Sequence, residues 1–150
     1  MDLILWRHAE AVDGQPDLAR ELTPKGVKQA KAIARWLTSR LPRQTRIVVS
    51  PAERTRQTAA ALTDDFEMDP QLAPGAPPTA VLAASGWPEH KGAVLVVGHQ
   101  PTLGMAAALV IAGEPMPWSI KKGGIWWLSH RVRGEHPQIV LRAVISPDLL

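Results

Sequence analysis

The chain has 150 residues, 45% of them hydrophobic, which is enough for one domain with a single core over residues 1–150. It has no cysteine, so disulfides, thiolate zinc sites and a cysteine nucleophile are excluded, and a cytoplasmic location is expected. The net charge of +3 comes from scattered basic residues, and with one Phe and no Tyr we expect no nucleic-acid partner. No stretch is long enough to cross a membrane, and no membrane partner is expected.

The N-terminal part of the chain predicts a strand, a helix and a second strand. An apolar run at residues 3–6 predicts a short buried strand. Thr23 and Pro24 then suit the N-cap and the first position of a helix, which Pro42 ends. A second apolar run at residues 46–49 predicts the next strand.

The second strand leads directly into another predicted helix. The sequence Ser50-Pro51-Ala52-Glu53 has the form of a capping box, with Pro51 at the first helical position. The helix is expected to continue to about Leu62. Arg54 would therefore lie in its first turn.

The rest of the chain continues the alternation and then closes with a hairpin. The predicted elements are a strand near 66–68, a helix over 79–84, a central strand over 93–97, a helix over 101–111, and two strands over 124–130 and 138–145. This order predicts an α/β three-layer sandwich with a mostly parallel sheet. Trp126 and Trp127 should face opposite sides of their strand, and His90, His130 and His136 should be exposed.

Three of the predicted strands lead into residues that suit an anion. The first strand is followed by Arg7 and His8. The second leads to Arg54, and the central strand to His99. Because ligands bind at the carboxyl ends of strands in open α/β sheets, these side chains converge if the three strands are neighbours. Two helix N-termini would add free N–H groups there.

Two guanidiniums, two imidazoles and helix amides suit a phosphate group. A neutral histidine can attack phosphorus and hold the phosphoryl group covalently, which favours catalysis over binding alone. The arginines disfavour the protonated imidazole and balance the charge of the transferring group. No histidine pair has metal-ligand spacing, so we predict neither a metal nor a cofactor.

Three segments resemble motifs of the histidine phosphatase superfamily, which is phosphoglycerate mutase-like in fold. Arg7-His8-Ala9-Glu10 resembles its Arg-His-Gly signature, although Ala9 replaces the usual Gly. The segment at 50–59 is similar to its Ser-Pro-x-x-Arg-x-x-Gln-Thr-Ala motif, and the segment at 97–101 to its Gly-His motif. The short length and the Gly-His-x-Pro form look most like SixA-type phosphohistidine phosphatases. The resemblance implies catalytic roles for His8, the nucleophile, and His99, with Arg7, Arg54 and His99 binding the phosphoryl group.

The proton donor departs from the family pattern. Many relatives have a Glu in the loop after the second helix, but residues 70–75 contain no carboxylate. The nearest substitutes are Glu10, Asp13, Asp17, Glu67 and Asp69. Each is expected to be a surface or capping residue, so the donor is one of these or none.

The expected function is that of a cofactor-independent phosphatase acting through phospho-His8, with phosphohistidine on a protein as substrate. An imidazole can leave without a built-in acid, and the short Pro/Gly-rich stretch between Leu62 and Ala93 offers little material for a lid over the pocket. One alternative is a phosphatase for small phosphorylated metabolites. Another is a phosphate- or phosphoprotein-binding module without turnover.

Overall fold

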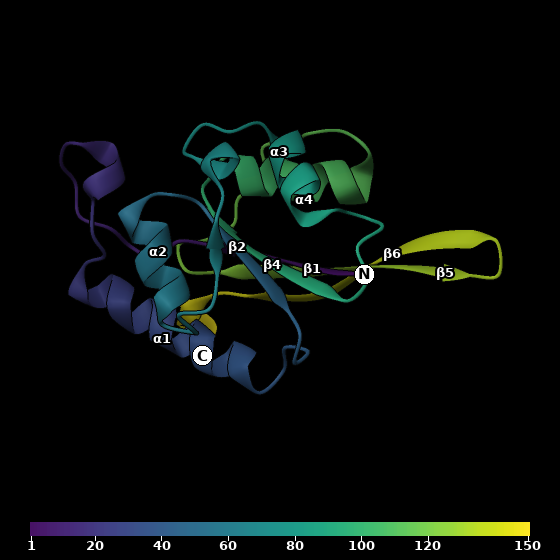
Figure 1. Cartoon of the computed structure of the whole chain (residues 1–150), viewed down its shortest axis with the longest axis horizontal. Coiled ribbons are helices and arrows are strands. Elements are labelled where there is room, and N and C mark those ends of the chain that lie inside the picture. The colour runs from purple at the N-terminus through teal and green to yellow at the C-terminus, as the bar shows by residue number, and fades with distance from the viewer.

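A six-stranded sheet forms the centre of the protein, with the strand order β3-β2-β4-β1-β5-β6 (Figure 1). The structure is a computed structural model that describes residues 1–150. The strands are β1 (Asp2–Arg7), β2 (Arg46–Val49), β3 (Glu67–Met68), β4 (Ala93–Gly98), β5 (Ile125–Arg133) and β6 (His136–Ile145). Strands β1 to β4 are parallel, whereas β5 and β6 are antiparallel to their neighbours. The predicted α/β class, the mostly parallel sheet and the closing hairpin are confirmed.

Helices cover both faces of the sheet. They are α1 (Pro24–Thr38), α2 (Glu53–Ala60), α3 (Pro78–Ser85) and α4 (Thr102–Ala112), with 3-10 turns at η1 (Asp17–Ala19), η2 (Pro70–Leu72) and η3 (Pro147–Leu149). Helices α1 and α2 lie on one face, and α3 and α4 lie on the other (Figure 1). This is the three-layer arrangement that the sequence predicts.

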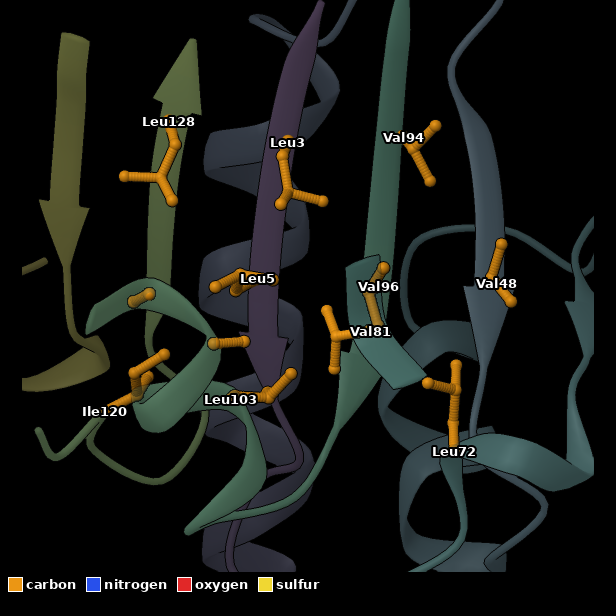
Figure 2. Close-up of a cluster of buried hydrophobic side chains, with 12 residues drawn as sticks. Leu3, Leu5, Val48, Leu72, Val81, Val94, Val96, Leu103, Ile120 and Leu128 are labelled. Carbon is orange, nitrogen blue, oxygen red and sulfur yellow. The ribbon is translucent and has the colours of Figure 1, made fainter. Parts of the chain in front are cut away.

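Alternation along β1 divides the core into two layers. Leu3 and Leu5 face α3 and α4, where they join an apolar cluster with Val81 and Leu103 (Figure 2). Ile4 and Trp6 belong to the opposite cluster, against α1 and α2, and all of these side chains are buried. Both faces of the central strands are therefore apolar, as expected for parallel strands covered by helices on both sides.

The start of α1 follows the prediction, and it fixes the chain just after β1. The hydroxyl of Thr23 accepts a hydrogen bond from the Gly26 amide at 2.9 Å, and Pro24 is the first helical residue. A Cβ on Gly26 would lie 2.0 Å from the carbonyl oxygen of Glu10. Only glycine allows α1 to approach the segment after β1 this closely.

The start of α2 differs from the prediction. The helix begins at Glu53 with Ala52 as its N-cap, and no side chain caps it, so the predicted capping box is wrong. The physical reason is that the Ser50 hydroxyl lies 2.6 Å from a ring nitrogen of His99. The hydroxyl is therefore hydrogen-bonded to the residue that follows the neighbouring strand β4, and its distance to the Ala52 amide is 3.4 Å.

The β5–β6 hairpin extends the sheet beyond the helices (Figure 1). Trp126 and Trp127 face opposite sides, as predicted: Trp126 packs beside the α3–α4 layer and Trp127 beside the α1–α2 layer.

His136 is exposed, but His90 and His130 are half-buried, so their predicted exposure is wrong. His130 stacks edge-on against Trp87, with 5.8 Å between ring centroids. No helix has the length and apolar character needed to span a bilayer.

Candidate active site

The two site histidines lie side by side at the carboxyl ends of β1 and β4. These strands pair in parallel with Arg7 opposite Gly98, so His8 and His99 follow at the same level of the sheet. The amide of His8 also donates to the Gly98 carbonyl at 3.1 Å. The imidazole centroids are 5.3 Å apart, and the residues are only 9% and 4% exposed. The predicted convergence of these two residues is confirmed by the strand register.

His8 is held in one tautomer by the backbone carbonyl of the next residue. Its Nδ1 lies 2.7 Å from the carbonyl oxygen of Ala9, and because a carbonyl only accepts, Nδ1 carries the proton. The neutral ring then leaves a lone pair on Nε2. Burial lowers the pKa of His8 to about 4, although the bond to Ala9 opposes the shift, and the nearby Arg54, Arg7 and Arg20 lower it further. His8 is therefore neutral at pH 7, with one nitrogen free to act as a nucleophile.

The guanidinium of Arg7 is anchored at one end and unpartnered at the other. Its Nη1 donates to the carbonyl of Ile120 at 2.8 Å. Its Nε is buried and has no hydrogen-bond partner. Burial lowers the pKa of Arg7, but an arginine keeps its charge at neutral pH. An unpartnered N–H on a buried cation is suited to an incoming anion.

Arg54 shows the same division between anchored and free N–H groups. It lies in the first turn of α2 and is 4% exposed. Its Nη1 donates to the Asp17 carbonyl at 2.8 Å, and its Nη2 donates to an Asp17 carboxylate oxygen at 3.1 Å. Its Nε is buried without a partner. The two Nη atoms of Arg54 thus hold the loop that contains Asp17, and Nε remains free.

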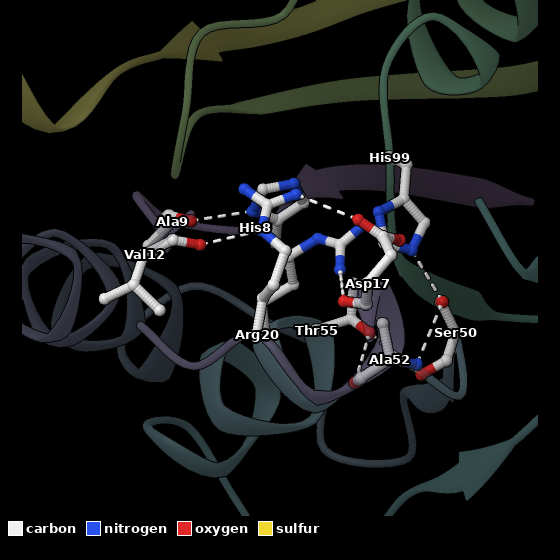
Figure 3. Close-up of polar contacts among 10 residues, drawn as sticks. His8, Ala9, Val12, Asp17, Arg20, Ser50, Ala52, Thr55 and His99 are labelled. Carbon is white, nitrogen blue, oxygen red and sulfur yellow. Dashed lines mark hydrogen bonds and ion pairs between the residues drawn. The ribbon is translucent and has the colours of Figure 1, made fainter. Parts of the chain in front are cut away.

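The His99 ring is fixed from the β2 side. Its Nε2 lies 2.6 Å from Ser50 Oγ, and its Nδ1 is buried with no partner. In Figure 3, Ser50 lies on one side of the ring and His8 on the other. Burial lowers the pKa of His99 to about 3, and His8 and Arg54 reinforce the shift. His99 is therefore neutral at pH 7.

Two residues that the sequence does not assign to phosphate binding lie at the site. Asp17 and Arg20 belong to the loop between β1 and α1, and the η1 turn places both next to the histidines (Figure 3). Arg20 Nη1 is 3.0 Å from the Asp17 carboxylate, and Arg20 Nε is 2.7 Å from the Val12 carbonyl. No strand or helix pattern signals this placement, because it depends on the path of an irregular loop. It is this loop, rather than residues 63–92, that contacts Arg54.

Only one of the five candidate proton donors reaches the site. Glu10 accepts from the Thr23 hydroxyl at 2.8 Å. Glu67 pairs with Arg46, Asp69 caps the η2 turn, and Asp13 is exposed with no hydrogen bond. Asp17 is the exception, but the hydrogen bond from Arg20, together with that from Arg54, lowers the pKa of its carboxyl group. Asp17 is therefore ionised at neutral pH.

Both predicted helix starts are at this end of the sheet. Helix α2 begins one residue before Arg54, and α4 begins at Thr102, shortly after His99. Across the structure, no three His, Asp or Glu side chains come together as a potential metal-ligand group. The buried N–H groups of the site instead favour an anion.

Comparisons with known proteins identify the family to which the chain belongs. Residues 3–76 match the model of the histidine phosphatase superfamily, branch 1. The chain is 30% identical over 126 residues to the phosphohistidine phosphatase SixA of Escherichia coli strain K12. The match covers 78% of each chain. The protein therefore belongs to the histidine phosphatase superfamily, and this membership supports a phosphatase activity.

Solved structures extend the comparison to nearly the whole chain. The structure of the protein histidine phosphatase SixA complexed with tungstate matches with a TM-score of 0.79 and 24% identity over 99% of both chains. A phosphoserine phosphatase from Entamoeba histolytica, complexed with 3-phosphoglyceric acid, matches with a TM-score of 0.71 and 19% identity over 97% of this chain and 96% of that one. The phosphoglycerate mutase-like fold is thus confirmed, and it is shared by proteins whose names give different substrates.

Proposed function

We propose that the protein is a cofactor-independent phosphatase that passes the phosphoryl group through Nε2 of His8. The observation that carries this proposal is the free lone pair on buried, neutral His8 beside three buried nitrogens without partners. Those nitrogens are Arg7 Nε, Arg54 Nε and His99 Nδ1. In this proposal they bind the peripheral oxygens of the transferring phosphoryl group, whose charge must be balanced.

The reaction then has two steps. In the first, the His8 Nε2 lone pair forms a bond to phosphorus, while the bond from phosphorus to the leaving group breaks and its electron pair departs with that group. In the second, water attacks phospho-His8, the N–P bond breaks, and inorganic phosphate is released as His8 regains its neutral form. Arg7 and Arg54 remain charged throughout and stabilise both transition states.

The leaving group favours a phosphohistidine substrate. An alkoxide needs a proton from a well-placed acid, and the one carboxyl group at this site, Asp17, has a lowered pKa. An imidazole can take its proton from solvent and leave as a neutral ring, because unmodified histidine has a pKa of about 6.5. The relative SixA is named a phosphohistidine phosphatase. We therefore propose phosphohistidine on a protein as the substrate class.

A comparison of matched substrates tests this choice. Two peptides of one sequence would carry phosphohistidine or phosphoserine at the same position. We expect kcat/KM to be at least roughly tenfold higher for phosphohistidine, about 1.4 kcal/mol of differential transition-state stabilisation. Equal values, or faster phosphoserine hydrolysis, would favour a small phosphomonoester substrate, as the fold shared with a phosphoserine phosphatase allows.

A second experiment tests the covalent step. We expect His8→Ala to abolish turnover while leaving the fold intact, and we expect wild type to yield an acid-labile phosphoenzyme labelled on His8. His136→Ala is the matched control, because His136 is exposed on the hairpin. Label on another residue, or activity in His8→Ala, would refute the assignment. Phosphate binding without any turnover would leave a phosphate-binding module as the function.

A further inference from the structure

Ser50 and His99 form a buried pair whose geometry is set by the sheet. Ser50 follows β2 and His99 follows β4, and the two strands are paired in parallel up to Val49 and Val97. The Ser50 amide continues this ladder by donating to the Val97 carbonyl at 3.0 Å. The hydroxyl thereby reaches His99 Nε2 at 2.6 Å, with Ser50 fully buried and His99 only 4% exposed (Figure 3).

The direction of this hydrogen bond follows from counting the donors and acceptors that are left unpaired. Ser50 Oγ has two neighbours within hydrogen-bond distance, His99 Nε2 and the Ala52 amide. The amide is a donor and cannot accept the hydroxyl proton. If Nε2 also donated, the buried hydroxyl proton would have no acceptor, which is unfavourable in a protein interior. In that arrangement the Nδ1 lone pair would also be buried without a partner. If the hydroxyl instead donates to Nε2, the Nδ1–H is the one group of the pair that lacks a partner in the free protein.

We propose that Ser50 is a positioning residue that holds His99 in the tautomer protonated on Nδ1. The proton then lies on the one ring nitrogen that is buried and has no partner. His99 becomes a neutral donor directed away from Ser50, toward the side where His8 lies (Figure 3). This role rests on the proposed function, since the acceptor it serves is a phosphoryl oxygen.

The consequence is a division of labour among the phosphoryl-binding groups. Arg7 and Arg54 supply charge, whereas His99 supplies a directed hydrogen bond from an uncharged ring. In the opposite tautomer, Nδ1 would present a lone pair to the phosphoryl oxygens and repel them. The Ser50 hydroxyl therefore decides whether His99 attracts or repels the group in transfer.

The tautomer can be measured without any enzymatic assay. Two-bond ¹⁵N–¹H correlation spectra of ¹⁵N-histidine-labelled protein at pH 7 distinguish Nδ1–H from Nε2–H rings, and His99→Asn identifies the His99 signals. We expect at least a roughly tenfold excess of the Nδ1–H form in wild type, because the other form leaves two buried groups of the pair without partners instead of one. An Nε2–H ring in wild type would overturn the inference, whether or not the enzyme is active.

Variants of Ser50 test the consequence. In Ser50→Ala we expect the Nδ1–H excess to be lost, inorganic phosphate to bind about tenfold more weakly and kcat/KM to fall at least as much, with Ser50→Thr restoring all three. Ser85→Ala removes another fully buried hydroxyl, one that donates to the Leu82 carbonyl, and should change none of them. An unchanged tautomer or unchanged phosphate affinity in folded Ser50→Ala would overturn the role. If Ser50→Ala does not fold, the wild-type spectrum and Ser50→Thr decide.

These measurements separate the two proposals. A protein that holds His99 as Nδ1–H, binds phosphate and hydrolyses nothing would refute the proposed phosphatase and leave the role of Ser50 in place. A protein that is fully active with His99 as Nε2–H would refute the role of Ser50 alone.

Discussion

Asp17 holds two of the three nitrogen atoms of the Arg54 guanidinium. Its carbonyl oxygen accepts from Nη1 at 2.8 Å, and its carboxylate accepts from Nη2 at 3.1 Å. The arginine side chain is 5% exposed and the aspartate side chain is 46% exposed. The free site thus contains a carboxylate next to the nitrogen atoms that are proposed to bind phosphate.

This arrangement predicts the effect of Asp17→Asn. The carbonyl contact and an amide oxygen would still orient Arg54, but the negative charge that opposes an incoming anion would be gone. We expect inorganic phosphate to bind about three- to tenfold more tightly, or about 0.7 to 1.4 kcal/mol, measured by calorimetry. Asp13→Asn makes the same change at an exposed position of the same loop and should have no effect. Weaker binding in Asp17→Asn would show that the carboxylate is needed to position Arg54.

Arg54→Lys should impair the site although it keeps the charge. A lysine ammonium cannot contact Asp17 and the phosphoryl group simultaneously through a planar fork. We expect a loss of about 100-fold in kcat/KM and weaker inorganic phosphate binding. Arg56→Lys is the control in the same helix, because Arg56 is 43% exposed and pairs with Glu53. Wild-type behaviour of Arg54→Lys would show that Arg54 does not bind the phosphoryl group.

Chelators should leave the activity unchanged. Arg7 and Arg54 supply the positive charge that a divalent ion provides in metal-dependent phosphatases. The measurement is the rate of phosphohistidine hydrolysis before and after dialysis against EDTA. A loss of activity that a divalent ion restores would contradict the proposed mechanism.

The two buried histidines predict a fall in stability below neutral pH. Their pKa values are about 4 for His8 and about 3 for His99 in the folded protein, whereas an unfolded chain has about 6.5. Between pH 6.5 and 4 the unfolded chain therefore binds protons that the folded protein does not. The free energy of unfolding should be constant above about pH 6.5 and fall as the pH drops, by up to about 2.7 kcal/mol per pH unit for two such imidazoles.

Urea unfolding at several pH values checks this dependence. His8→Gln should reduce the slope between pH 6.5 and 4.5, because one of the two groups is removed. His136→Gln should leave it unchanged, since His136 is exposed. A wild-type stability that does not change across this range would mean that the histidines are not buried in their neutral form.

The parts of the site that follow strand ends could be predicted from the sequence. Arg7, His8 and His99 come directly after apolar runs, and parallel strands bring their carboxyl ends to one edge whatever the details of packing. Arg54 could be placed because it lies in the first turn of a helix that follows such a strand. For these residues, short-range pattern was sufficient once the three strands proved to be neighbours, with β4 between β1 and β2, and the structure places His8 beside His99.

The parts that depend on side-chain choice or loop path could not be predicted in this way. A Ser-Pro-x-Glu sequence has the form of a helix cap, yet the Ser50 hydroxyl bonds to a residue 49 positions away, and local pattern carries no information on that partner. Asp17 reaches Arg54 because of the course of an irregular loop. The sequence offers Asp17 as one of five candidate proton donors, and only the folded structure shows which of the five carboxylates lies at the site.

The position of β4 has a consequence for the synthesis of the protein. This strand pairs with β1 on one side and β2 on the other, and β1 and β2 do not pair with each other. On the ribosome, the segments bearing Arg7 and Arg54 emerge long before Ala93, the first residue of β4. A nascent chain that ends before that point has no strand to hold them in register, and it lacks His99. Affinity for phosphate should therefore arise late, when β4 inserts into the sheet. The incomplete nascent chain should not bind phosphorylated molecules in its surroundings.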